Sequence, residues 1–178
     1  VMRAALAEGA AMINDISALR HPDAMAAVAG SDCALCLMHM RGEPGTMQNA
    51  PAYSDVVREV REFLVARVAA VRAVGIDDCR LVLDLGFGFG KSLQHNLVLF
   101  RALTAAGVDD LPMLVGVSRK SMLGAITGRP VEQRLAASIA AATLAALKGA
   151  KILRVHDVAE TSDALAVLAA IEEGVGNE

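Results

Sequence analysis

Short apolar runs alternate along the chain with longer stretches in which apolar and polar residues recur at helical spacing. Each run is continuously apolar, which is typical of a strand buried on both faces of a parallel sheet. These predicted strands occupy residues 10–13, 34–38, 81–83, 113–117 and 151–155. Because a helical segment follows each run, the pattern predicts an α/β protein built from five strand–helix units.

Helices are expected between these strands and at both ends of the chain. The clearest one has an apolar face formed by Val57, Val60, Leu64, Val68 and Val71. Ser54 is expected to cap this helix and Gly75 to end it. The other helices are predicted at residues 3–9, 21–29, 93–106 and 131–147, and after residue 157. Asp157 and Glu160 resemble an acidic capping box for the last helix.

Two architectures fit five such units in 178 residues. A (β/α)8 barrel uses roughly 31 residues per unit, so five units would fill about 155 residues. The chain is expected to be a single domain over residues 1–178. It is either a complete doubly wound sheet or the C-terminal part of a barrel whose first three units lie outside it. Periodicity alone leaves both possibilities open.

Composition and charge narrow the functional classes. The formal net charge is −3, so the chain lacks the basic footprint of a nucleic-acid-binding protein. The longest uncharged apolar stretch, residues 135–147, is shorter than the roughly 20 residues that span a bilayer. Cys33 and Cys36 have the spacing of a metal or redox pair, but on a strand they would point to opposite faces. Reduced thiols in a cytoplasmic protein are expected instead.

Polar residues follow the end of every predicted strand. They are Asn14, His39, Asp84, residues 118–121, and Arg154 with His156. Because the C-terminal ends of parallel strands open on one face of a barrel, these groups are expected to converge there. Each also has a plainer explanation: Asn14 as a helix cap, His39 as a packed loop residue, and residues 118–121 as a solvated helix start.

A glycine-rich turn follows Asp84. Gly86, Gly88 and Gly90 permit positive φ angles and close approach of the backbone to a ligand. The spacing does not fit a Walker loop, which needs glycine directly after Asp84. It does not fit the dinucleotide fingerprint either, which needs glycine directly after Gly90. The turn is therefore a candidate ligand site of another kind.

The residue types predict a ligand with a flat nitrogen heterocycle. A buried Asp beside an Asn suits the adjacent donors and acceptors of such a ring. Met38, Phe87 and Phe89 offer soft or flat surfaces against which it could pack.

An anionic group is predicted as well. Arg119 and Lys120 stand beside a predicted helix N-terminus, where their charges oppose the helix dipole unless an anion is bound. Arg154 and His156 lie two residues apart on one face of a strand and suit a phosphate, as does Arg41.

Four stretches and one tripeptide give the chain a specific resemblance. They are LMHMRGEPGTMQ, LDLGFGFGKS, LVGVSRKSMLG, RVHDVAET and the Ile-Asn-Asp that contains Asn14. In this order and spacing they resemble dihydropteroate synthases over essentially the whole chain. The resemblance implies the last five units of a (β/α)8 TIM barrel of folate biosynthesis. Such an enzyme condenses 6-hydroxymethyl-7,8-dihydropterin pyrophosphate with p-aminobenzoate to give 7,8-dihydropteroate and pyrophosphate.

The resemblance also implies roles for single residues. It assigns the pterin to Asn14, Met38, Asp84 and Lys120, p-aminobenzoate to Phe89 and Ser121, and pyrophosphate to Arg154 and His156. Lys120, Arg154 and His156 are the implied catalytic residues. Mg²⁺ is the implied cofactor, with its protein ligand outside this chain. A cytoplasmic homodimer that sulfonamides target is implied too, and the Ala-rich helix predicted at residues 131–147 suits a dimer interface.

Two departures from the family bear on activity. Leu85 stands where the family's turn has proline, and the family's N-terminal strands lie outside the chain. Residues 1–178 alone are therefore expected to be inactive. Two alternatives stay open: a pterin-binding domain of the methyltetrahydrofolate methyltransferase type, and a non-catalytic pterin-binding or pairing partner.

Overall fold

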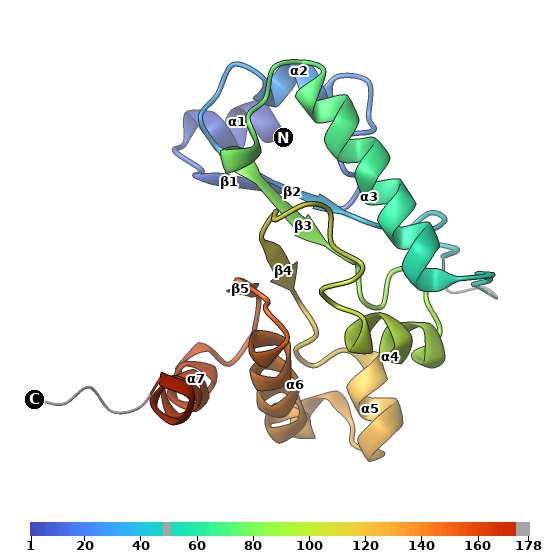
Figure 1. Ribbon diagram of the computed structural model, residues 1–178, viewed down its shortest axis with the longest axis vertical. Coiled ribbons are helices and arrows are strands. Elements are labelled where there is room, and N and C mark those ends of the chain that lie inside the picture. The colour runs from blue at the N-terminus through green and yellow to red at the C-terminus, as the bar shows by residue number, and fades with distance from the viewer. Residues whose placement is uncertain (48–50, 174–178) are drawn as a thin grey trace, which may run out of the picture.

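The computed structural model describes residues 1–47 and 51–173, and within them it forms a curved parallel sheet covered by helices (Figure 1). The strands are β1 (Met12–Asp15), β2 (Ala34–Met38), β3 (Leu81–Asp84), β4 (Met113–Val115) and β5 (Ile152–Leu153). They pair in the order β1-β2-β3-β4-β5, and every pairing is parallel. A doubly wound sheet reverses its strand order at a switch point, whereas a barrel keeps sequence order. The chain is thus a curled half-barrel.

Helices cover the outer side of this half-barrel, and Figure 1 shows α3 to α6 following its convex side. The α-helices are α1 (Met2–Ala7), α2 (Ala24–Val28), α3 (Val56–Arg72), α4 (Leu93–Arg101), α5 (Ser121–Thr127), α6 (Leu135–Leu147) and α7 (Val158–Glu173). Two short 3-10 helices are η1 (Asp78–Arg80) and η2 (Val131–Gln133). No helix in the described part of the chain is long and apolar enough to cross a membrane.

Side chains alternate between the two faces of the sheet. Leu35, Leu37, Leu81, Leu83 and Val115 enter the large core beneath the helices. Residues between them, Cys36, Val82 and Leu114, form a smaller cluster on the inner face, where Met12 and Ile152 join them. Cys33 lies in the large core and Cys36 in the inner cluster, so the prediction of opposite faces is confirmed.

The predicted elements are recovered with shifted ends. β1 begins two residues later than expected and includes Asn14, while β4 and β5 stop earlier because the chain leaves the ladder after Val115 and Leu153. The helix predicted to reach residue 106 ends at Arg101. The segment predicted as one helix over residues 131–147 is broken at Arg134 into η2 and α6.

Two predicted caps were wrong. Asp55, not Ser54, caps α3, because its carboxylate accepts a hydrogen bond from the Arg58 N–H at 3.0 Å. Asp157 does not form the predicted capping box with Glu160. Its carboxylate pairs instead with the Arg119 guanidinium, whose Nε donates to Asp157 Oδ2 at 3.1 Å. Ser54 is engaged elsewhere, because its N–H and its hydroxyl both donate to the Glu59 carboxylate. Asp157 is engaged by a charged donor, the Arg119 guanidinium.

Candidate active site

Asp84 ends β3 on the inner face and is the most buried acid at the strand ends, with 2% of its surface exposed. Its Oδ1 accepts the Gly86 N–H at 2.7 Å. Burial raises the pKa of this carboxyl, while the Gly86 hydrogen bond and the charges of Lys120, Arg154 and Lys91 oppose the rise. Three cations from separate segments therefore surround one buried carboxyl.

Lys120 immediately precedes α5 and points across to the glycine-rich turn. Its Nζ donates to the carbonyl of Phe87 and lies 4.9 Å from the centre of the Phe89 ring. The pKa of Lys120 is lowered to about 8, chiefly by burial and in part by the Arg154 charge, while the Asp84 charge opposes the fall. The amine is thus held at the turn, where it feels the charge of the Asp84 carboxyl.

The backbone before Lys120 is held by neighbouring elements. The Arg119 N–H donates to Ser138 Oγ in α6 at 2.9 Å, and Arg134 donates to the Arg119 carbonyl at 3.0 Å. The Arg119 side chain is paired with Asp157. Arg119 was expected to attract an anion, but its charge is already engaged by the Asp157 carboxylate. Attraction of an anion is therefore left to the other basic residues of the site.

A basic pocket of about 340 Å³ opens beside these residues. It is lined by Gly116, Ser118, Arg119, Lys120, Val131, Arg154 and His156. Ser118 Oγ lies 3.3 Å from the His156 backbone nitrogen and 3.0 Å from His156 Nδ1. A Cβ on Gly116 would lie 2.9 Å from an Arg154 guanidinium nitrogen, so glycine leaves the room that Arg154 occupies. Cationic and hydroxyl groups in one pocket suit an oxyanion.

Asn14 and Met38 lie at the same rim. Asn14 follows Met12 by two residues and so shares its inner face, where it is exposed. Met38 is the register partner of Asp84 and is 2% exposed. Asp15, not Asn14, holds the turn after β1, because its carboxylate accepts from Ser17 and Leu19. Asn14 is therefore available on the inner face.

The two residues predicted to contact p-aminobenzoate lie next to Lys120. Phe89 is half-buried beneath Lys120, and Ser121 is the exposed first residue of α5. The structure thus brings the predicted pterin, aminobenzoate and pyrophosphate residues to the C-terminal ends of adjacent strands.

Two other expectations were wrong. Phe87 is fully buried among the outer helices, with its ring 5.7 Å from that of Phe100, because it points away from the inner face. It cannot stack on a ligand there. Arg41 is paired with Glu59 at 2.6 Å and lies 4.6 Å from the Tyr53 ring centre, so it does not line the basic pocket.

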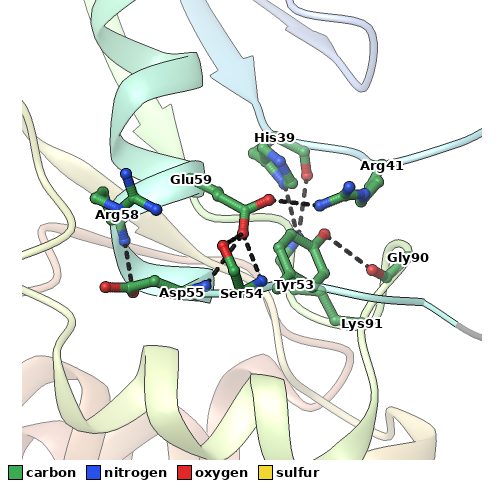
Figure 2. A network of polar contacts seen from close by, with 9 residues as sticks. All are labelled: His39, Arg41, Tyr53, Ser54, Asp55, Arg58, Glu59, Gly90 and Lys91. Atoms are coloured by element: carbon green, nitrogen blue, oxygen red, sulfur yellow. Dashed lines mark hydrogen bonds and ion pairs between the residues drawn. The ribbon is translucent and has the colours of Figure 1, made fainter.

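A polar network behind the glycine-rich turn was not predicted (Figure 2). Lys91 Nζ lies 2.9 Å from His39 Nδ1, and Tyr53 donates its hydroxyl to the Gly90 carbonyl at 2.9 Å. His39 is 5% exposed; burial lowers its pKa to about 3, and the neighbouring Lys91 contributes to that fall. His39 is therefore a neutral, packed residue, as its plainer explanation held.

Comparison with known proteins identifies the family. Residues 1–156 match the model of the family described as pterin binding enzyme. The chain belongs to the pterin-binding enzymes. One relative is the dihydropteroate synthase of Haemophilus influenzae, which is 48% identical over 167 residues, covering 94% of this chain and 61% of the relative.

Solved structures agree. The dihydropteroate synthase of Stenotrophomonas maltophilia, with imidazole bound in its active site, superposes with a TM-score of 0.94 at 49% identity, covering 99% of this chain and 67% of that one. The Burkholderia cenocepacia dihydropteroate synthase complexed with 7,8-dihydropteroate gives a TM-score of 0.91 at 50% identity, covering 97% and 64%. The chain thus spans about 61% of the length of the Haemophilus relative.

The described residues of this chain do not by themselves offer a Mg²⁺ site. Within residues 1–47 and 51–173, no group of three or more His, Cys, Asp or Glu side chains is arranged to hold a metal ion. Mg²⁺ prefers carboxylate and phosphate oxygens, whereas this pocket presents cations. The pocket fits the anion and not the metal.

Proposed function

We propose that the full-length protein containing this chain is a dihydropteroate synthase. It would join 6-hydroxymethyl-7,8-dihydropterin pyrophosphate to p-aminobenzoate and release pyrophosphate. The observation that carries the proposal is the meeting of Asp84, Lys120 and Arg154 at one rim of the half-barrel, beside a basic pocket. The close match to a synthase complexed with 7,8-dihydropteroate supports it.

Asp84 is the centre of the proposed pterin site. A carboxylate can accept hydrogen bonds from adjacent N–H groups of a 2-amino-4-oxo ring, and Asn14 can pair with the remaining donors and acceptors. Lys120 approaches the same ring as a donor, and Met38, the register neighbour of Asp84, packs against its face.

The departing pyrophosphate is proposed to occupy the basic pocket. Arg154 and His156 hold its oxygens, and Ser118 keeps the His156 ring oriented through its Oγ. The aryl amine of p-aminobenzoate forms a bond to the pterin methylene carbon while the carbon–oxygen bond to pyrophosphate breaks. One amine proton passes to solvent. Lys120, Arg154 and His156 stabilise the charge that develops on the leaving group.

The second substrate is proposed to stack on Phe89 and to place its carboxylate at Ser121. Ser121 is the exposed first residue of α5 and directly follows Lys120, so its hydroxyl is available to a carboxylate there. The half-buried Phe89 ring under the Lys120 amine gives a flat wall on one side of this position.

Cofactor, assembly and location belong to the same proposal. Mg²⁺ is proposed as the cofactor, with no ligand assigned to this chain. A homodimer through α6 and α7 is supported by their exposed Leu144, Leu147, Val167 and Ile171. A cytoplasmic location is supported by the cysteines, all three of which are free thiols in described parts of the chain.

The test is turnover by the full-length protein with both substrates and Mg²⁺. We expect 7,8-dihydropteroate and pyrophosphate to form in equal amounts, and residues 1–178 alone to be inactive. Pterin binding without turnover would replace the proposal with a non-catalytic pterin-binding role. Methyl transfer from methyltetrahydrofolate without pyrophosphate release would replace it with the methyltransferase alternative.

A further inference from the structure

The Lys91 amine lies inside the glycine-rich turn and does not line the basic pocket. Its Nζ is 2.9 Å from the Gly86 carbonyl, 3.1 Å from the Phe89 carbonyl and 2.9 Å from His39 Nδ1. Each of these partners is neutral, and the residue is only 3% exposed. Placing an amine here is unfavourable, because burial disfavours its charged form and lowers the pKa of Lys91 to about 7.

Two of these partners connect Lys91 to the proposed substrate contacts. Gly86 accepts from Lys91 through its carbonyl and donates its own N–H to the Asp84 carboxylate at 2.7 Å. Phe89 accepts from Lys91 through its carbonyl and carries the ring beneath the Lys120 amine. The backbone of Phe89 also donates to Gly86 at 3.0 Å, which closes the turn around the amine.

The turn has little freedom on its other side. A Cβ on Gly86 would lie 1.8 Å from the His39 carbonyl, and one on Gly90 would lie 2.2 Å from the Arg41 carbonyl. The Tyr53 hydroxyl donates to the Gly90 carbonyl, and Arg41 lies over the Tyr53 ring (Figure 2). The turn is thus fixed between the end of β2 and the segment that enters α3.

We propose that Lys91 is a positioning residue that sets the Asp84 carboxylate and the Phe89 ring in their working orientations. It does so by holding the carbonyls of Gly86 and Phe89 from inside the turn. This inference rests on the proposed function. Removing the amine should therefore weaken binding of the pterin and aminobenzoate parts of the product and leave the pyrophosphate pocket unchanged.

The experiment compares Lys91→Met with wild type in the full-length protein. Calorimetry measures the affinity for 7,8-dihydropteroate, which spans both substrate positions, and separately for inorganic pyrophosphate. We expect Lys91→Met to weaken dihydropteroate binding by tenfold or more and to change pyrophosphate binding by less than twofold. Lys148→Met is the matched control, because Lys148 is an exposed lysine that also donates to a carbonyl, and it should change neither.

Other results would overturn the inference. Equal losses of both affinities would show that Lys91 merely supports the whole fold, and unchanged dihydropteroate binding would show that the turn does not need it. If Lys91→Met does not fold, the same two affinities are measured for Tyr53→Phe, which removes only the hydroxyl that holds Gly90. Tyr53→Phe should weaken dihydropteroate binding by a smaller factor than Lys91→Met and leave pyrophosphate binding unchanged. Unchanged dihydropteroate binding in Tyr53→Phe would refute the inference. Failure of the wild type to bind dihydropteroate would instead refute the proposed function.

Discussion

At His39 the environment of a single ring predicts how stability depends on pH. The folded state keeps this buried ring neutral down to a pKa of about 3, whereas the unfolded chain protonates it near 6.5. The unfolded state therefore binds more protons below pH 6.5, and stability is lost as pH falls through that range. Between pH 6.5 and 5 this loss amounts to about 1.7 kcal/mol.

The prediction for His39 is tested by urea unfolding of the full-length protein at both pH values. His39→Gln should remove that part of the acid sensitivity, because glutamine has no proton to bind. Replacing the exposed His21 by glutamine is the control and should leave the slope unchanged. Parallel pH dependences in wild type and His39→Gln would contradict the assignment.

Lys120 gives a second prediction at the scale of one residue. Its amine lies near Asp84 and Arg154, at the place where charge is proposed to develop. Lys120→Ala in the full-length protein should weaken pterin binding and lower the rate of dihydropteroate formation by tenfold or more. Steady-state kinetics measure this, with Lys148→Ala as the control. Wild-type kinetics in Lys120→Ala would remove the residue from the site.

The glycine-rich turn is the element on which the site depends most. Gly86 has a φ of +66°, and an added Cβ would meet the His39 carbonyl at 1.8 Å, so Gly86→Ala combines strain with a clash. Gly75 has a similar φ of +80° but open space around it. Gly75→Ala should cost about 1–2 kcal/mol from strain alone.

Denaturant titration of the two full-length variants tests this reasoning. Gly86→Ala should be several kcal/mol less stable than wild type, because main-chain atoms that cannot rotate away must shift. Similar losses for Gly86→Ala and Gly75→Ala would show that the approach of His39 to the turn is looser than the structure indicates.

Sequence patterns predicted most elements and missed what long-range contacts decide. The strand at residues 34–38 was predicted to the residue, because a continuous apolar run leaves few alternatives. Arg134 interrupts a pattern that looks helical throughout, and there its guanidinium reaches the carbonyls of Arg129 and Arg119. No local signal reports such contacts. The sequence also does not show that Asp55 rather than Ser54 caps α3, since both residue types are good caps.

The candidate site follows the same division. The placement of Asn14, Asp84, Lys120 and Arg154 at one rim could be predicted, because each lies at or just after a strand end and parallel strands bring these ends together. The pairing of Arg41 with Glu59, and the burial of Phe87 toward the helices, depend on packing between segments far apart in sequence. The positioning role proposed for Lys91 needed the contacts inside the turn.

At the scale of the whole molecule, α6 and α7 predict an assembly. Leu144 and Leu147 are about half exposed on α6, and Ile171 is 73% exposed on α7. We expect the full-length protein to sediment as a dimer and Leu144→Lys to shift it toward monomer, since a charge cannot be buried there without a partner. Val74→Lys, at an equally exposed apolar position after α3, is the control and should stay dimeric. A monomeric wild type at micromolar concentration would contradict this prediction.

The central claim is that groups from separate strand ends form one site for a pterin and its departing diphosphate. The most direct test is a crystal structure of the full-length protein with 7,8-dihydropteroate and pyrophosphate. The account predicts the pterin ring within hydrogen-bonding distance of Asp84 and the diphosphate between Arg154 and His156. A product bound away from Asp84, or a diphosphate outside the basic pocket, would contradict it.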